Sequence, residues 1–192
     1  MNIRYLPVSW NEYHELAQKL AAKLLSYGKK IDEIVAISRG GLTLGHAFTD
    51  LLQVTISTFT IQSYTDVKTQ GKVRITKPLS SPIYDKHILL VDDVSDTGKT
   101  LLRALEYLKT QQPKTVTTLT LFYKPHSVYK PDYFAKTTPD WIIFPYETTE
   151  TIISISKKLA KEGKTKKEIT TLLQKLNFTR EQISFVRTHH LT

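Results

Sequence analysis

The sequence carries its strongest structural pattern at His87-Ile88-Leu89-Leu90-Val91-Asp92-Asp93-Val94-Ser95-Asp96-Thr97-Gly98-Lys99-Thr100. The first five residues form an apolar run, which is typical of a strand buried on both faces of a parallel sheet. Small and polar residues follow from Asp92, and a helical pattern then continues through about Lys109. The stretch therefore predicts a strand, a turn and a helix in immediate succession.

The same order occurs nearer the N-terminus. A short apolar run at Glu33–Ile37 predicts a strand, Ser38-Arg39-Gly40-Gly41 predicts a turn, and a helical pattern then extends to Leu52. Further strands are predicted over Val54–Ile61, Val116–Phe122 and Trp141–Phe144. Because right-handed crossovers return each strand beside the last, this alternation predicts an α/β fold with a mostly parallel twisted sheet flanked by helices.

The other segments complete the predicted organisation. A helix is predicted over 10–27, because Ser9-Trp10-Asn11-Glu12 has the spacing of a capping box. Ser63–Thr76 is polar with little apolar periodicity and predicts an irregular, mobile excursion, and the residues between Phe122 and Trp141 predict a loop. From Thr149 onward the spacing of Ile and Leu predicts two or three short helices. We therefore expect an α/β domain over 1–150 and a basic helical appendage over 151–192.

Composition excludes several classes of protein. The 192 residues contain no Cys, which excludes a disulfide framework, a thiolate metal site and a cysteine nucleophile. The net charge is +9, from 27 Lys and Arg against 18 Asp and Glu, and residues 151–192 hold nine of the cations and three of the acids. We expect these cations to form the solvated face of the appendage helices. Neither a signal peptide nor a membrane-spanning run is recognisable, so we expect a cytoplasmic protein without a membrane partner.

The chemistry concentrates between Asp92 and Thr100. A strand that leads through small residues into a helix offers N–H groups and a positive dipole end, so Thr97–Thr100 suit a phosphate. Asp92 and Asp93 repel each other and repel phosphate, unless the ligand also brings vicinal hydroxyls or a divalent cation. A ribose phosphate has those parts, whereas the alternative is that the two acids only cap a helix.

Two other phosphate-handling classes fail on the same residues. A P-loop needs Gly five positions before Gly98, where this chain has Asp93. A phospho-accepting receiver domain needs an Asp at the end of a strand between the acids and Lys124-Pro125, and Leu101–Tyr123 contains none. We therefore exclude both the nucleoside triphosphatase and the receiver domain.

Val91–Thr100 resembles the phosphoribosyl pyrophosphate (PRPP) motif of type I phosphoribosyltransferases, and most closely that of the 6-oxopurine branch, the hypoxanthine-guanine and xanthine-guanine enzymes. The resemblance extends over roughly residues 30–150. It implies that Asp92 and Asp93 hold the ribose hydroxyls and help to bind Mg²⁺, and that Asp96 is the general base beside N7 of the purine. It implies that the 5′-phosphate is held by Ser95, Thr97, Gly98, Lys99 and Thr100.

The resemblance also implies roles outside this motif. Arg39 and Gly40 match the pyrophosphate loop, and Ser63-Tyr64 resembles the Ser-Tyr pair of the flexible lid. Lys124 looks like the lysine that donates to the purine O6, which disfavours adenine. Trp141 and Ile142 resemble the pair that stacks on the base and reads its edge. Glu147 falls where the family has an acid near pyrophosphate and metal, so Asp93 and Glu147 are the expected metal ligands.

The implied reaction joins PRPP to a 6-oxopurine and releases pyrophosphate and the nucleoside 5′-monophosphate, a step of purine salvage, with Mg²⁺ as cofactor. By analogy we expect a homodimer. One alternative is a regulator of the same fold that senses nucleotides and binds RNA or DNA through the basic tail. Another is a phosphoribosyltransferase for a different acceptor, such as adenine, a pyrimidine or an anthranilate.

Overall fold

The computed structural model describes residues 4–66, 69–79 and 81–191. These residues form two compact units. The larger unit spans His14–Pro139, and the smaller one combines the described residues up to Tyr13 with those from Asp140 onward. The expected division into an α/β domain over 1–150 and a basic helical appendage over 151–192 stays a prediction.

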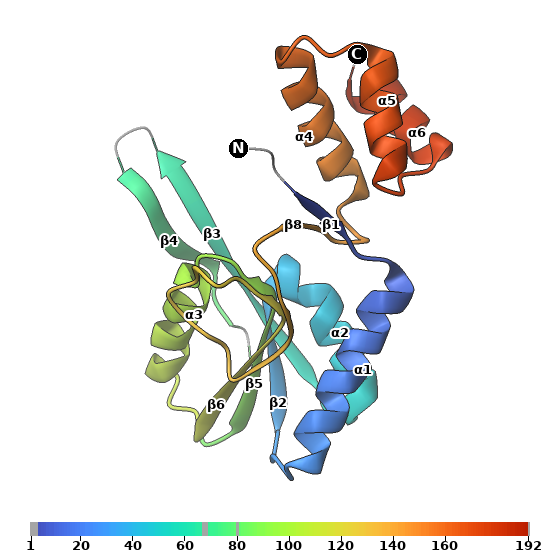
Figure 1. The fold of residues 1–192 in the computed structure, drawn as a ribbon. Helices are drawn as coiled ribbons and strands as arrows, with labels where there is room; N and C mark the ends of the chain where they lie inside the picture. The colour runs from blue at the N-terminus through green and yellow to red at the C-terminus, as the bar shows by residue number, and fades with distance from the viewer. Residues whose placement is uncertain (1–3, 67–68, 80, 192) are drawn as a thin grey trace. The chain divides into compact units, whose positions relative to one another are not determined.

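A six-stranded sheet forms the centre of the larger unit (Figure 1). Its strands lie in the order β4-β3-β2-β5-β6-β7, and all neighbours are parallel except β3 and β4. The strands are β2 (Glu33–Ser38), β3 (Ile56–Asp66), β4 (Thr69–Lys77), β5 (His87–Ser95), β6 (Thr115–Tyr123) and β7 (Tyr133–Thr137). The predicted α/β fold with a mostly parallel sheet is therefore confirmed.

Helices cover both faces of this sheet (Figure 1). They are α1 (Trp10–Ser26), α2 (Gly40–Leu52) and α3 (Lys99–Thr110). Leu101, Ala104 and Leu108 of α3 pack in a core cluster with alternate residues of the strands, Val35 and Leu90 among them. Gly45 of α2 lies against Ile34 and Ala36, which point to the opposite face because side chains alternate along a strand. The central strands β2 and β5 are thus buried on both sides, as their apolar runs predict.

The smaller unit combines a short parallel strand pair with three helices. Strand β1 (Tyr5–Pro7) pairs with β8 (Trp141–Ile143), and the helices are α4 (Thr148–Lys161), α5 (Lys166–Lys175) and α6 (Arg180–His190). Their core consists of Ile143, Ile152, Ile155, Ile169, Leu173, Phe178, Ile183 and Val186. The helical pattern from Thr149 onward is confirmed. No helix in the described ranges has the length and apolarity that a bilayer crossing requires.

The segment expected to be irregular is a β-hairpin. Strand β3 continues to Asp66, and β4 returns antiparallel from Thr69 to Lys77. The expectation of an irregular Ser63–Thr76 is therefore wrong for the described backbone. The sequence contained the pattern in part, because Val73 and Ile75 alternate with Lys72 and Arg74, which is the period of a strand.

The loop expected after β6 also contains a strand. Residues Tyr133–Thr137 form β7, an edge strand paired with β6. The Asp132 carboxylate accepts hydrogen bonds from the Thr118 N–H and hydroxyl, both at 2.8 Å, and so fixes where this strand begins. A polar contact to a distant residue thus determines the strand, which is why five residues of modest apolarity did not predict it.

The capping box at the start of α5 makes the stability of the fold depend on pH in the acid range. The Glu168 carboxylate accepts from the Thr165 N–H at 2.8 Å and from its hydroxyl at 2.9 Å. These bonds, together with a weaker contribution from the Lys164 ammonium at 3.2 Å, lower the pKa of Glu168 from 4.5 to about 2. A lowered folded-state pKa stabilises the fold above pH 4.5, and this contribution disappears as the pH falls toward 2. We expect Glu168→Gln to flatten the loss of thermal stability over that range.

The natural comparison is α6, whose capping box has the neutral Gln182 in the same position. Gln182→Glu is expected to steepen the acid dependence that Glu168→Gln flattens, and circular dichroism melts between pH 2 and 6 measure both. Parallel melting profiles for the two variants and the natural chain would contradict the assignment of this dependence to the capping boxes.

Candidate active site

Two acids lie at the carboxyl end of β5. The strand runs on to Ser95, so Asp92 and Asp93 belong to the strand itself rather than to the turn expected after Val91. They are only 7% and 8% exposed. A Cβ placed on Gly40, at the start of α2, would collide with the Asp93 carboxylate. A side chain at Gly40 would therefore displace the Asp93 carboxylate where the turn after β2 meets the acids of β5.

Burial acts on the protonation of Asp92. The pKa of Asp92 is raised well above its ordinary value, first by desolvation and then by the negative charge of Asp93. Hydrogen bonds from the backbone N–H of Asp93, at 3.1 Å, and of Gly41 act in the opposite direction. Two neighbouring carboxyls in such a site suit a ligand that supplies hydroxyl donors or a divalent cation.

The residues fit a magnesium ion whose ligands come partly from the protein and partly from a bound substrate. Mg²⁺ is commonly held by one or two carboxylates, with waters and substrate phosphates completing its octahedron. Asp92 and Asp93 provide two carboxyls in sequence on one strand. The described residues contain no cluster of three or more His, Asp or Glu that would hold a metal without help. The donor set thus matches a cation that arrives with a phosphorylated substrate.

The turn after the acids leads directly into the N-terminus of a helix. Gly98 has a φ of +79° and immediately precedes α3, and the Lys99 N–H lies 3.4 Å from the Thr97 hydroxyl. The first N–H groups of a helix lack intrahelical acceptors and carry the positive end of its dipole. This is the predicted cradle of Thr97, Gly98, Lys99 and Thr100, and its geometry suits a phosphate.

A second segment, Lys124–Tyr129, is hydrogen-bonded to this turn. The Lys124 N–H donates to the Ser95 carbonyl at 3.1 Å, and the Val128 N–H donates to the Thr97 carbonyl at 3.0 Å. The Ser95 hydroxyl lies 2.9 Å from that of Ser127 and donates to the Tyr129 carbonyl at 2.8 Å. Ser95 therefore holds the two segments together, while its predicted contact with a 5′-phosphate stays a prediction.

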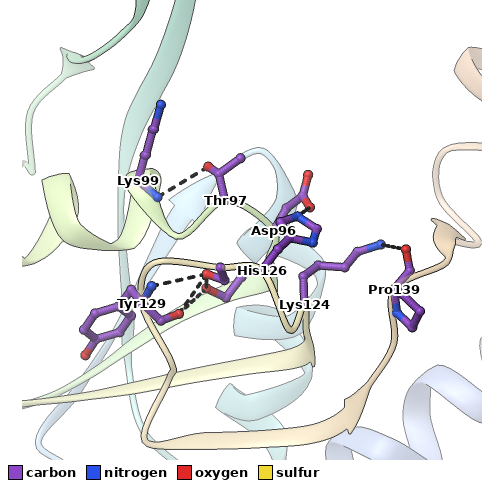
Figure 2. A network of polar contacts seen from close by, with 9 residues as sticks. Asp96, Thr97, Lys99, Lys124, His126, Tyr129 and Pro139 are labelled. Atoms are coloured by element: carbon purple, nitrogen blue, oxygen red, sulfur yellow. Dashed lines mark hydrogen bonds and ion pairs between the residues drawn. The ribbon is translucent and has the colours of Figure 1, made fainter.

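Figure 2 shows the side chains that these two segments bring together. The Asp96 carboxylate lies 3.2 Å from Nε2 of His126, and the Lys124 ammonium donates to the Pro139 carbonyl at 3.4 Å. Lys124 is only 6% exposed although it is charged. The predicted base and the predicted purine-binding lysine thus stand on adjoining segments. His126 was not foreseen from the sequence.

Arg39 and Gly40 lie at the neighbouring strand end. They follow β2, which pairs in parallel with β5, so they share the sheet edge that carries the two acids. Arg39 is exposed and precedes α2, and the Ser38-Arg39 peptide bond is cis. Ser63 and Tyr64 lie in β3, and their side chains fall outside the described residues. Their role in a lid stays a prediction.

The other predicted site residues belong to the smaller unit. Trp141 opens β8 and is 58% exposed, Ile142 is buried beside it, and Glu147 directly precedes α4. Trp141 and Glu147 share a pocket of about 220 Å³ with Tyr5, Glu150, Ser154 and Lys158 among its lining residues. The structure thus brings Trp141 and Glu147 together within that unit, and their predicted contacts with purine and metal stay predictions.

Comparisons with known proteins agree with this geometry. The family model described as the phosphoribosyl transferase domain matches residues 9–151. A hypoxanthine phosphoribosyltransferase of Haemophilus influenzae is 35% identical over 128 residues, which are 62% of this chain and 70% of that protein. The crystal structure of a purine phosphoribosyltransferase from Pyrococcus horikoshii Ot3 is 32% identical, with a TM-score of 0.69 over 75% of this chain and 94% of that chain.

A further solved structure is similar in fold. The xanthine-guanine-hypoxanthine phosphoribosyltransferase of Helicobacter pylori is 24% identical, with a TM-score of 0.66 over 78% of this chain and 98% of that chain. The matching family model spans about three quarters of the sequence and includes β2, β5 and the segment from Lys124 to Tyr129. The chain therefore belongs to the phosphoribosyl transferase family.

Proposed function

We propose that this protein transfers the 5-phosphoribosyl group of PRPP to N9 of a 6-oxopurine, namely hypoxanthine, guanine or xanthine. The products are the nucleoside 5′-monophosphate and pyrophosphate, and the role is purine salvage. The observation that carries the proposal is the pair of buried acids, Asp92 and Asp93, directly before a phosphate cradle at the same strand end. The relatives named as hypoxanthine and purine phosphoribosyltransferases support it.

The chain's own residues divide the work of binding PRPP. Thr97, Gly98, Lys99 and Thr100 receive the 5′-phosphate through the helix N-terminus. Asp92 and Asp93 accept hydrogen bonds from the ribose hydroxyls, which favours the charged form of the buried Asp92 carboxyl. Arg39 and Gly40 bind the pyrophosphate group, since a guanidinium and exposed N–H groups suit a diphosphate.

Mg²⁺ would be held by Asp92 and Asp93, with Glu147 as a further candidate, and would supply positive charge against the departing pyrophosphate. The bond between the anomeric carbon and pyrophosphate breaks, and its electron pair leaves with pyrophosphate. The positive charge that develops at the anomeric carbon is met by N9 of the purine, and the proton on N7 passes to the Asp96 carboxylate. No covalent intermediate with the protein is needed.

Two groups would read the purine. The ammonium of Lys124 can only donate, so it favours an oxygen at position 6 over an amino group. Its ammonium donates to the Pro139 carbonyl at 3.4 Å, and its backbone N–H donates to the carbonyl of Ser95, the residue before Asp96, at 3.1 Å. Trp141 would stack on the base, and backbone groups at Ile142 would read its edge. We further propose that the protein is cytoplasmic and forms a homodimer, and that Ser63 and Tyr64 belong to a lid over the site.

The comparisons favour this reaction over a nucleotide-sensing regulator that binds RNA or DNA. The relatives named above are phosphoribosyltransferases, and Asp96 and Lys124 serve the transfer step rather than nucleic-acid binding. The lysines of α4 and α5 that the sequence assigns to a solvated face, such as Lys157, Lys161 and Lys167, are exposed. Charges in that arrangement need no nucleic-acid partner.

A base panel tests the proposal. The purified chain is assayed spectrophotometrically with PRPP and Mg²⁺ against hypoxanthine, guanine, xanthine and adenine, and again with EDTA. We expect turnover of at least one 6-oxopurine, little turnover of adenine, and loss of all activity with EDTA that added Mg²⁺ restores. The Asp92→Asn/Asp93→Asn double variant should be inactive at every Mg²⁺ concentration.

Two results would contradict the proposal. One is no turnover of any 6-oxopurine by a folded chain that still binds PRPP in calorimetry, which would indicate a regulator or another acceptor. The other is turnover that EDTA does not reduce. That result would show that Mg²⁺ is not a cofactor of the reaction.

A further inference from the structure

We infer that His126 is a positioning residue for Asp96, and this inference rests on the proposed function. Nε2 of His126 lies 3.2 Å from Oδ1 of Asp96, which is hydrogen-bonding distance. The two residues come from different segments, one directly after β5 and the other three positions after the end of β6. The contact joins the predicted base to the segment that carries the predicted purine-binding lysine (Figure 2).

Backbone hydrogen bonds before and after His126 hold its segment beside Asp96. On one side, the Lys124 N–H donates to the Ser95 carbonyl at 3.1 Å, and on the other the Val128 N–H donates to the Thr97 carbonyl at 3.0 Å. The Ser127 N–H donates to the Lys124 carbonyl at 3.0 Å, which closes a turn around His126. The imidazole therefore faces Asp96 because its backbone is held there, and not because two long surface side chains happen to meet.

The role of the contact is orientation rather than stability. The Asp96 and His126 side chains are 55% and 60% exposed, and ion pairs at such sites contribute little to folding. A donor on Oδ1, however, restricts rotation of the carboxylate and leaves Oδ2 for the proton on N7 of the purine. The Nε2–H of a neutral imidazole is such a donor. Proton transfer depends steeply on the placement of the base, so the benefit appears in the rate.

The ammonium of Lys124 does not take the place of His126 as the donor to Asp96. The Lys124 ammonium stands nearby on the same segment, but it donates to the Pro139 carbonyl at 3.4 Å. It is also the group proposed to bind the purine O6. Among the described side chains of this site, it is therefore His126 that is hydrogen-bonded to Asp96.

Three variants test the inference. His126→Ala removes the donor, His126→Gln keeps an N–H donor on a side chain of similar reach, and His14→Ala removes another exposed histidine that lies on α1. We expect His126→Ala to lower kcat by about tenfold or more, with the KM for PRPP changed by less than about twofold. His126→Gln should recover most of the loss, and His14→Ala should match the natural chain. All three should melt within a few degrees of it.

A double-mutant cycle shows through which group His126 acts. If it works through Asp96, then His126→Ala should have little further effect on kcat in an Asp96→Asn background. A full tenfold loss in that background contradicts the inference, as does an unchanged kcat in the single variant. A fall in melting temperature together with a raised KM for PRPP assigns His126 to packing of the phosphate turn instead, and also contradicts it.

The two proposals fail in different ways. A natural chain without 6-oxopurine transfer overturns the proposed function and this inference with it. An active natural chain whose kcat does not respond to His126→Ala overturns the inference alone.

Discussion

Asp96→Asn is expected to lower kcat by about 10²- to 10⁴-fold while PRPP binding changes little. The amide keeps the size of the side chain and its hydrogen bond with His126, but it cannot accept the N7 proton of the purine. Asp96 follows the buried acids and is itself 55% exposed, so its loss leaves the ribose and phosphate contacts intact. The effect belongs to the transfer step, because the carboxylate receives the proton only as N9 forms its new bond.

Steady-state kinetics and calorimetry with PRPP separate these contributions. Asp50→Asn, an exposed residue of α2, is the matched control and should leave both quantities unchanged. An Asp96→Asn variant with the natural kcat would remove Asp96 from the role of base. A large loss of PRPP affinity would place its main contribution in binding instead.

Much of the fold was accessible from the sequence because buried parallel strands have a simple pattern. Glu33–Ile37 and His87–Val91 are apolar runs, and both became central strands buried on both faces. The hairpin beyond Ile61 was missed because its residues are mainly polar and pair with each other rather than with the central strand β2. The edge strand β7 was missed because its position depends on Asp132 and Thr118, which are far apart in the sequence.

Some residues of the candidate site could likewise be predicted from the sequence, and one could not. Asp92, Asp93, Asp96 and the phosphate cradle lie in one continuous motif, so local sequence is enough to locate them. His126 has no such motif, because its role arises from the pairing of β5 with β6, in which Ser95 lies opposite Tyr123. That register brings the residues just after one strand beside those just after the other. The available clue was general: residues that follow neighbouring parallel strands meet at one edge of the sheet.

Gly98→Ala is expected to destabilise the larger unit by about 2–5 kcal/mol and to weaken PRPP binding. At a φ of +79° any side chain is strained, which costs about 1–2 kcal/mol. A Cβ there would also stand 2.5 Å from the Ser127 hydroxyl and 2.6 Å from the Tyr129 nitrogen, so the backbone must shift at a further cost of about 1–3 kcal/mol. The shift would separate the phosphate cradle from the segment that carries Lys124 and His126.

Gly28→Ala isolates the backbone contribution. Gly28 lies in the same unit with a φ of +59°, and a Cβ there would have nothing within 4 Å. We expect this control to lose only about 1–2 kcal/mol in urea unfolding and to bind PRPP normally. Equal losses for the two variants would mean that Ser127 and Tyr129 yield without cost. The contact between the two segments would then be too loose to orient Asp96, whereas a larger loss at Gly98 means that the packing which holds the cradle also holds the base.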